Sequence, residues 1–245
     1  MVAKFCVGIS ELLAFSAMVL AILVNMGQIS QNIVARNIYY AELDLSGVSS
    51  GGALPANVFA QNQAAPELQG QGLKETYQWG LYNFCGGAGN TRSCGPRGFG
   101  DGRFEPLQVL YADINQQYQT QLNQTVSEGT FADSDYLGRF SHAAFWLIFI
   151  GTVLAGLTFL LGFLAHRFAF LVAALVALLG AAALGAGAAI FTAILVKARD
   201  SIADVAGAQL HLTNALWMMW AAFGALTLSI VPFIISCCTG RSEKY

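Results

Sequence analysis

The chain has 245 residues, of which 56% are hydrophobic and only 11% are charged, and its formal net charge is −2. Soluble domains contain about 25% charged residues, so this composition, together with a mean hydropathy of +0.55, excludes an ordinary soluble domain and indicates a membrane protein. The slight negative charge also argues against nucleic-acid binding, which requires a basic surface.

Four segments are long and apolar enough to cross a bilayer, which takes about 20 residues of helix. We predict spans at about 6–26, 140–164, 168–196 and 212–236. The first is too long for a signal peptide, and Val24-Asn-Met-Gly-Gln28 lacks the small residues of a cleavage site. Glu11 is the only carboxylate inside a predicted span. We expect it to reach the membrane interface; an ion or proton relay is the less favoured alternative, because no second carboxylate lies near mid-membrane.

The first span is followed by a long polar loop, 27–139, in which four stretches differ in character. Gly47–Gln71 is rich in Gly, Ala, Gln, Asn and Pro and is interpreted as an irregular insertion with little reason to pack. Tyr77–Phe84 is aromatic and typical of a strand, whereas the glycine-dense Gly86–Gly102 is typical of turns. In Phe104–Leu122 the apolar residues fall near helical spacing, which predicts a short amphipathic helix.

The same loop contains Trp79-Gly-Leu-Tyr-Asn-Phe-Cys85, followed nine residues later by Cys94. Two closely spaced cysteines can close a disulfide loop in an oxidising compartment. Large apolar side chains such as Trp79 suit the packing of a small extracellular sheet. The sequon Asn123-Gln-Thr125 predicts a possible glycosylation site, which also places this loop outside the cytosol.

Even numbers of spans place both termini on one side, so we expect both termini in the cytosol and extracellular loops at 27–139 and 197–211. The whole chain, 1–245, is then a single four-span membrane domain. Three cysteines fall at the cytosolic ends of the first and last spans and are candidates for S-palmitoylation: Cys6, Cys237 and Cys238. Ordinary interfacial thiols are the equally favoured alternative.

The third span contains small residues at four-residue spacing, which let a second helix approach closely. These helix-packing candidates are Ala173, Ala177, Ala181, Gly185, Ala189 and Ala193. Packing within the bundle is the favoured interpretation, and self-association between copies is the alternative. In the fourth span, Thr213 and Asn214 can hydrogen-bond across helices, and Trp217 and Trp220 are expected to anchor at the interface.

No motif for metal, nucleotide or nucleophilic chemistry is found, so we expect no enzyme, no cofactor and no metal site. Loop acids Asp101, Glu105 and Asp113 are interpreted as solvated rather than as cation ligands. Contact of loop arginines with acidic polysaccharide or lipid phosphate is a minority interpretation; these are Arg92, Arg97 and Arg103.

Four spans, a large first loop and the motif Trp79, Gly80, Leu81, Tyr82…Cys85…Cys94 resemble the claudin superfamily, although here the Trp and the Gly-Leu-Tyr are adjacent rather than separated. Arg139-Phe-Ser-His-Ala-Ala-Phe-Trp146 and Gly207-Ala-Gln-Leu210 resemble the fungal branch, the Sur-seven/PalI family of eisosome-associated tetraspan proteins. The predicted fold is an all-α membrane protein, a claudin-like four-helix bundle with a small disulfide-closed extracellular β-sheet.

The resemblance implies a non-enzymatic plasma-membrane protein that organises cortical membrane domains and supports endocytosis control and cell-wall or stress integrity. Its expected partners are membrane lipids, further copies of itself or other membrane proteins of these domains, with no nucleic acid. The alternative is an auxiliary subunit or regulator of a channel or pH-sensing signalling complex. A channel or transporter in its own right is less favoured, because no paired charges lie near mid-membrane.

Overall fold

The structure is a computed structural model, and it describes residues 2–29, 32–51, 54–60, 71–88, 91–95, 102–126, 133–164, 167–203 and 207–239. The chain divides into two compact units. The membrane unit comprises Met1–Asn25, Ala144–Ala189 and Leu216–Tyr245, and the sheet unit comprises Met26–Ala143 and Ile190–Ala215.

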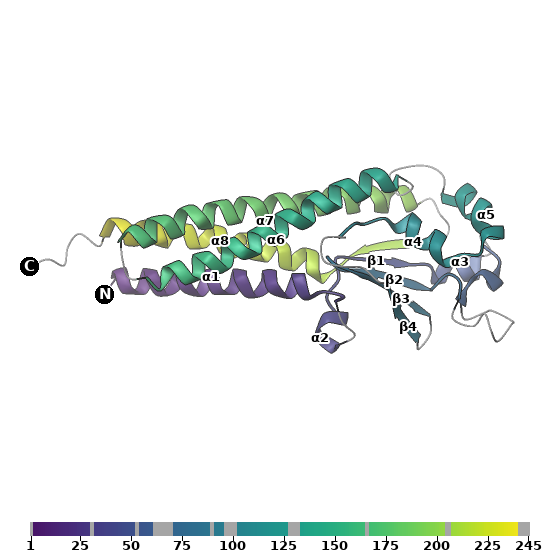
Figure 1. Ribbon diagram of the computed structural model, residues 1–245, viewed down its shortest axis with the longest axis horizontal. Coiled ribbons are helices and arrows are strands. Elements are labelled where there is room, and N and C mark those ends of the chain that lie inside the picture. Colours follow the sequence, from purple (N-terminus) through teal and green to yellow (C-terminus); the bar gives the residue numbers. More distant parts are fainter. Residues whose placement is uncertain are drawn as a thin grey trace, which may run out of the picture. The chain divides into compact units, whose positions relative to one another are not determined.

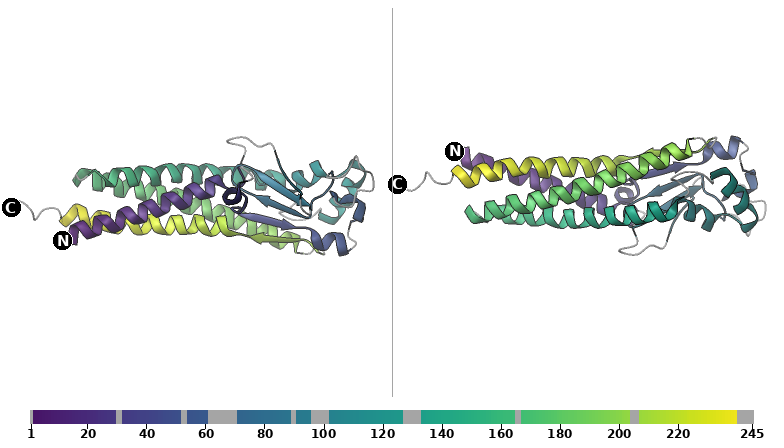
Figure 2. Two further views of the ribbon diagram at one scale, coloured as in Figure 1. Left: turned by 90° about the horizontal axis from the view of Figure 1, so that it is seen from below. Right: turned by 90° about the horizontal axis from the view of Figure 1, so that it is seen from above.

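The membrane unit is formed by the greater part of four long helices, which run side by side in every view (Figure 1, Figure 2). They are α1 (Val2–Met26), α6 (Ser134–Gly162), α7 (Arg167–Ile202) and α8 (Asn214–Thr239). Each contains a stretch apolar and long enough to cross a membrane: Val7–Met26, Ser134–Gly162, Phe168–Ile202 and Asn214–Ile235. The predicted four-span, mostly helical architecture is therefore confirmed.

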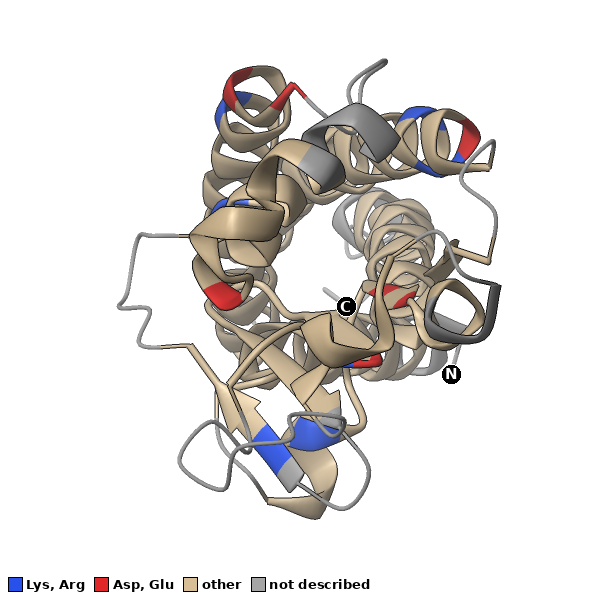
Figure 3. Ribbon diagram, turned by 90° about the vertical axis from the view of Figure 1, so that its right-hand side faces the viewer, with Lys and Arg blue, Asp and Glu red and all other residues tan. Residues whose placement is uncertain are grey.

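Two helices extend well beyond the bounds that hydropathy predicts. Helix α6 begins at Ser134 rather than Phe140, and α7 continues to Ile202 rather than Val196. Polar residues can extend a helix when their charges stabilise its ends, either by interacting with the helix dipole or by pairing one turn apart. Asp135 lies in the first turn of α6 and pairs with Arg139, one turn later, at 2.8 Å. In the end-on view of Figure 3, blue and red bands mark charged residues on the near ends of long helices.

Many of the side chains buried inside the membrane unit are small, although large ones such as Phe145 and Phe233 are buried there too. The buried residues include Ala14, Ala17, Ala21, Ala144, Ala155, Ala173, Ala177 and Ala222. Large apolar side chains on the same helices point outward, such as Leu12, Leu160, Leu179 and Leu228. Lipid supplies no hydrophobic drive between helices, so close approach of backbones over small residues is what associates them. The outward leucines suit a lipid environment.

Glu11 does not behave as the expected interfacial acid. Both of its carboxylate oxygens are buried and have no hydrogen-bond partner among the described residues. They lie against Gly162 of α6, where a Cβ atom would fall 1.4 Å from Oε1. Because Gly162 has no side chain, the Glu11 carboxylate fits against it.

The small-residue pattern of α7 is only half inside the bundle. Ala173, Ala177 and Ala181 are buried, but Ala189 and Ala193 are exposed, and Gly185 is intermediate. The reason is helix geometry, because a step of four residues turns the helix by about 40° beyond a full turn. Five such steps rotate the row by about 200°, so its two ends face opposite sides of the helix. The expectation of one continuous packing face is therefore wrong for the last two positions within one copy of the chain.

The sheet unit contains five antiparallel strands in the order β4-β3-β2-β1-β5 (Figure 1). They are β1 (Ala41–Asp44), β2 (Thr76–Trp79), β3 (Phe84–Ala88), β4 (Thr91–Cys94) and β5 (Gln209–Leu212). The predicted single strand Tyr77–Phe84 is instead the turn of the β2–β3 hairpin and its flanks. Strand β5 comes from the segment predicted as a loop, 197–211, and pairs Leu212 with Ala41. The fourth long helix consequently begins at Asn214 rather than at 212.

The helix predicted for Phe104–Leu122 is two helices, α4 (Pro106–Asp113) and α5 (Gln116–Val126). The backbone at Ile114 is extended, with ψ of 142°, and the Ile114 side chain is buried. Asp113, the last residue of α4, is held by Lys74 and the Tyr77 hydroxyl. Tertiary contacts thus end the helix where its apolar spacing would have continued it.

Two stretches that were expected to be irregular are ordered where the structure describes them. Helix α3 (Ser46–Gly51) and the short 3-10 helix η1 (Ala56–Val58) lie in the expected insertion, and Val48, Leu54 and Phe59 are buried. The interpretation of Gly47–Gln71 as an unpacked insertion is therefore wrong for 47–51 and 54–60, while 61–70 lie outside the described residues. Gly86 belongs to β3 rather than to a turn. The Lys74 side chain crosses it, 2.3 Å from where a Cβ atom would lie, so the position has no room for a side chain.

Candidate functional site

The disulfide of the sheet unit joins neighbouring strands. Cys85 of β3 and Cys94 of β4 are directly opposite each other in the strand register, and their sulfur atoms are bonded. The Cys85 side chain is buried. Strand β4 is the edge of the sheet and pairs only with β3. The predicted disulfide is thus confirmed, and it fastens the edge strand to the sheet.

Each residue of the signature motif has a structural role at the end of β2. Trp79 is only 1% exposed; its ring stacks on Tyr77 at 6.0 Å and meets the edge of Phe104 at 5.2 Å. The Gly80 amide donates to the Asn83 carbonyl at 2.9 Å and closes the turn into β3. A Cβ at Gly80 would lie 2.4 Å from the Gly27 carbonyl oxygen, so only glycine fits there.

The motif belongs to an aromatic core that joins distant parts of the chain. Phe104 also contacts Tyr40, at 6.0 Å between ring centroids, and Tyr40 lies 4.7 Å from Phe191 of α7. Leu81, the residue after the close glycine, is buried as well. Aromatic pairs of this kind contribute about 0.5–1.5 kcal/mol each beyond the area they bury. The motif therefore acts first as a packing device.

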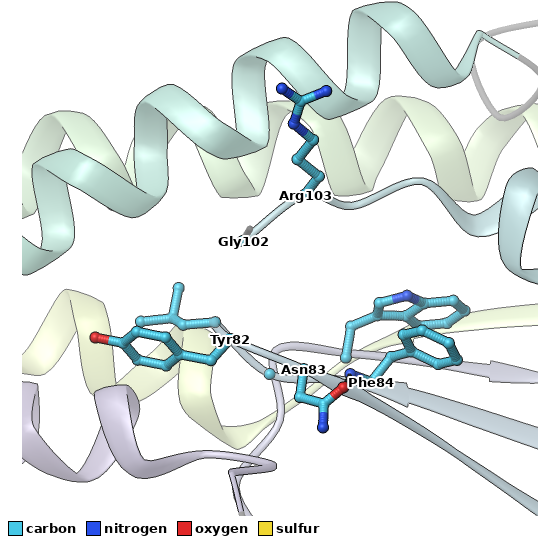
Figure 4. A pocket seen from close by; sticks show the side chains of 8 residues that line it. Tyr82, Asn83, Phe84, Gly102 and Arg103 are labelled. Carbon is cyan, nitrogen blue, oxygen red and sulfur yellow. Dashed lines mark hydrogen bonds between the residues drawn. The ribbon is translucent and has the colours of Figure 1, made fainter. Parts of the chain in front are cut away.

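A small recess opens beside the motif and is shown in Figure 4. It encloses about 150 Å³, including open solvent, whereas ligand pockets usually measure roughly 300–1,000 Å³. Tyr82, Asn83 and Phe84 lie on one side of it, and the Arg103 side chain on the other side points away from them. The Trp79 indole nitrogen is buried with no hydrogen-bond partner among the described residues. This recess is too small to serve as a cofactor site.

A buried polar cluster connects α4 to the sheet. Asp113 Oδ2 accepts hydrogen bonds from Lys74 Nζ at 2.8 Å and from the Tyr77 hydroxyl at 2.7 Å. Burial, and then the Asp113 charge, raise the pKa of Tyr77 well above its ordinary value. The phenol therefore stays protonated and keeps donating. Because Asp113 is an ion-pair partner of Lys74, it is not the solvated loop acid that was expected.

A second polar cluster surrounds Arg92. From the sequence, we considered this arginine only for contact with acidic polysaccharide or lipid phosphate. Its Nη2 donates to Gln28 Oε1, to Gln78 Oε1 at 2.9 Å and to the Arg36 carbonyl at 3.4 Å. Gln78 Nε2 in turn donates to Glu42 at 3.2 Å. Gln28 is buried and has a positive φ of 59°, which the many contacts of its side chain and amide must sustain. Nothing in the local sequence of Gln28 signals this role.

Residues 6–232 match the model of the SUR7/PalI family. The chain belongs to the SUR7/PalI family. No curated protein matches it. The family is not a known enzyme family, and the part of this SUR7/PalI chain that the structure describes holds no group of three or more His, Cys, Asp or Glu side chains suited to a metal ion. Membership and the four spans make the chain a multi-pass membrane protein of this family.

Other predicted site residues of this SUR7/PalI chain are placed less completely. Cys6 lies in α1, Cys237 and Cys238 lie in α8, and Asn123 lies in α5, but their side chains are outside the described part of the structure. Palmitoylation and glycosylation there stay predictions. Among the loop acids and arginines, Glu105 lies 3.7 Å from Arg103, whereas Asp101 and Arg97 are outside the described residues.

The polar residues at the start of α8 do not bond across helices as expected. The Asn214 side chain donates to the Asn37 carbonyl at 2.6 Å and accepts from the Tyr39 amide at 3.3 Å. The Thr213 hydroxyl donates to the Tyr39 carbonyl. These bonds fasten the beginning of α8 to the segment that leads into β1. They add to the pairing of β5 with β1 and tie the two predicted loops together.

Proposed function

We propose that this SUR7/PalI protein is a non-enzymatic plasma-membrane protein that organises cortical membrane domains of the eisosome type. In this role it supports endocytosis control and cell-wall or stress integrity. The observation that carries the proposal is the construction of the sheet unit. Both predicted loops contribute strands to one sheet, and a disulfide fastens its edge. Such a preformed surface can hold neighbours in place with little ordering cost.

The orientation follows from redox chemistry. Disulfides persist in oxidising compartments and are rare in the cytosol, so the Cys85–Cys94 bond supports a sheet unit outside the cytosol. With an even number of spans, both termini are then proposed to lie in the cytosol. Cys6, Cys237 and Cys238 would lie on that side, where acylation would favour thick, ordered membrane regions.

Lateral contacts are proposed to act through lipids and through other copies of the chain. Ala189 and Ala193 are exposed on α7. Small residues are enriched where membrane helices pack against each other. A neighbouring helix that packs against them would extend the bundle from one copy to the next. The protein would then work as a membrane organiser by packing rather than by chemistry.

The test is to tag the protein fluorescently in its native cells and to measure recovery after photobleaching. Static patches at the cell cortex are expected, and loss of the protein should alter endocytic uptake and sensitivity to cell-wall stress. A uniform or internal distribution would contradict the proposal. Purification of a stoichiometric channel or receptor partner in mild detergent would instead favour an auxiliary subunit.

A further inference from the structure

A short apolar segment projects from the chain immediately after the first span. Ile29 precedes the short helix α2 (Ile33–Arg36), and Ile33 and Val34 form the beginning of that helix. These three side chains are 56%, 77% and 55% exposed. We call them, together with the exposed Arg36, the α2 patch. All four residues lie beyond Met26, where the span ends, so contact of the span with lipid does not account for them.

Hydrogen bonds hold the α2 patch at the end of the span. The Gln28 amide donates to the Ala35 carbonyl at 2.9 Å, and its side-chain Nε2 donates to the Arg36 carbonyl at 2.9 Å and the Ile38 carbonyl at 3.3 Å. Helix α2 therefore folds back onto a residue only two positions after Met26. The 20 residues of Val7–Met26 span about 30 Å as a helix, which matches the thickness of a hydrocarbon core. We therefore expect Met26 at the edge of the core, and the chain keeps α2 within ten residues of it.

The charge of the patch is positive. The Arg36 side chain has no hydrogen-bond or ion-pair partner within the described part of the chain. Arg92 is held beside it by its bonds to Gln28 and to the Arg36 carbonyl. Burial, and then repulsion from Arg36, lower the pKa of Arg92, and the attraction of Glu42 is smaller. Two arginines thus lie near one end of α2, and the Glu42 carboxylate is joined to Arg92 through Gln78, which accepts from Arg92 and donates to Glu42.

We propose that the α2 patch is a lipid-binding surface, in which Ile29, Ile33 and Val34 insert between phospholipids and Arg36, with Arg92 beside it, binds a lipid phosphate. Apolar side chains flanked by arginine are the composition that binds membrane interfaces. Guanidinium groups match phosphate oxygens in bidentate geometry. The patch begins three residues after the span ends at Met26, so the chain itself keeps it near the bilayer. This inference goes beyond the proposed function and does not depend on it.

Insertion of the apolar residues is tested by the depth of a nitroxide label. The full chain, with Cys6, Cys237 and Cys238 replaced by serine and the disulfide kept, receives Ile33→Cys and is labelled in phosphatidylcholine nanodiscs. Gln108→Cys on the exposed face of α4 is the matched control. The label at 33 should collide more with dissolved oxygen than with a water-soluble nickel chelate, and the label at 108 should show the reverse. Equal, water-like accessibility at both positions would overturn insertion.

A second copy of the chain is the competing occupant. It would shield the label at 33 from oxygen and nickel alike and would produce a distance between labels on two copies. That result would overturn the proposal too.

The phosphate contact is tested by measuring phosphatidylserine retained by the purified full-length protein. Arg36→Gln should lower retention about fivefold, the effect of one interfacial arginine, and Arg36→Lys should retain most of it. Arg103→Gln, which removes the same charge from an arginine paired with Glu105, is the control and should change retention little. Equal losses in Arg36→Gln and Arg103→Gln would mean that net charge, not the α2 patch, recruits the lipid, and would overturn the phosphate site.

Discussion

Removing the disulfide should release the edge of the sheet while leaving its centre intact. The perturbation is Cys85→Ser together with Cys94→Ser, so that no lone thiol remains. The two cysteines are separated by nine residues, and a loop of this length contributes about 2.6 kcal/mol in the chain-entropy model. Among the described strands, β4 pairs with β3 alone, and a two-stranded hairpin is marginal in water. We therefore expect the β3–β4 pair to open about 80-fold more often.

Hydrogen exchange, read by mass spectrometry on the full chain in detergent or nanodiscs, measures this opening directly. Amides of β3 and β4 should exchange faster in the double variant, and amides of β1, which lies between β2 and β5, should change little. Ser93→Ala is the matched control, because Ser93 lies in β4 with an exposed side chain. Unchanged exchange in β3 and β4 would refute the assignment of the disulfide as the fastening of the edge strand.

Three further substitutions test close contacts by thermal or denaturant unfolding of the full chain. Gly80→Ala should destabilise by about 1–3 kcal/mol, because its Cβ would meet a backbone carbonyl at 2.4 Å; an unchanged midpoint would contradict this packing. Gly162→Ala should destabilise the otherwise unchanged protein, and it should destabilise a Glu11→Ala variant much less, with a coupling free energy of about 1–2 kcal/mol. Additive effects of the two substitutions would show that residues 11 and 162 do not touch. Asp113→Asn should cost about 2 kcal/mol by leaving the buried Lys74 ammonium without its carboxylate partner. Asp135→Asn, which breaks an exposed pair, should cost at most about 0.5 kcal/mol.

Local composition was sufficient to predict the spans and the disulfide. A run of about 20 apolar residues has few alternatives to a membrane helix, and only Cys85 and Cys94 lie in the long polar loop. The family resemblance rested on these features together with the stretches Arg139–Trp146 and Gly207–Leu210, and the match over residues 6–232 confirms it. These predictions succeeded because each depended on residues that are close together in the chain.

The failures have the opposite origin. Strand β5 has only four residues, and its partner β1 lies more than 160 residues earlier, so nothing local distinguishes it from a loop. The Gln28–Arg92 contact joins residues 64 positions apart. The helix break at Ile114 has no Gly or Pro to signal it in the sequence, and it directly follows Asp113, which is held by the distant Lys74 and Tyr77. The prediction for the small residues of α7 was wrong because residues spaced four apart were assumed to share one helix face. A helix has 3.6 residues per turn, so a long row with this spacing winds around it.

The residues of the signature motif stabilise the fold of the sheet unit. Trp79 fills its aromatic core, Gly80 admits the backbone that follows α1, and Cys85 fastens the edge strand. None of these groups is presented to a partner, because the tryptophan and the cysteine are buried and the glycine has no side chain. The motif can therefore support a common scaffold without specifying what the scaffold binds. Differences in function among proteins that share it should then lie in exposed residues, of which the α2 patch at the end of the first span is one set.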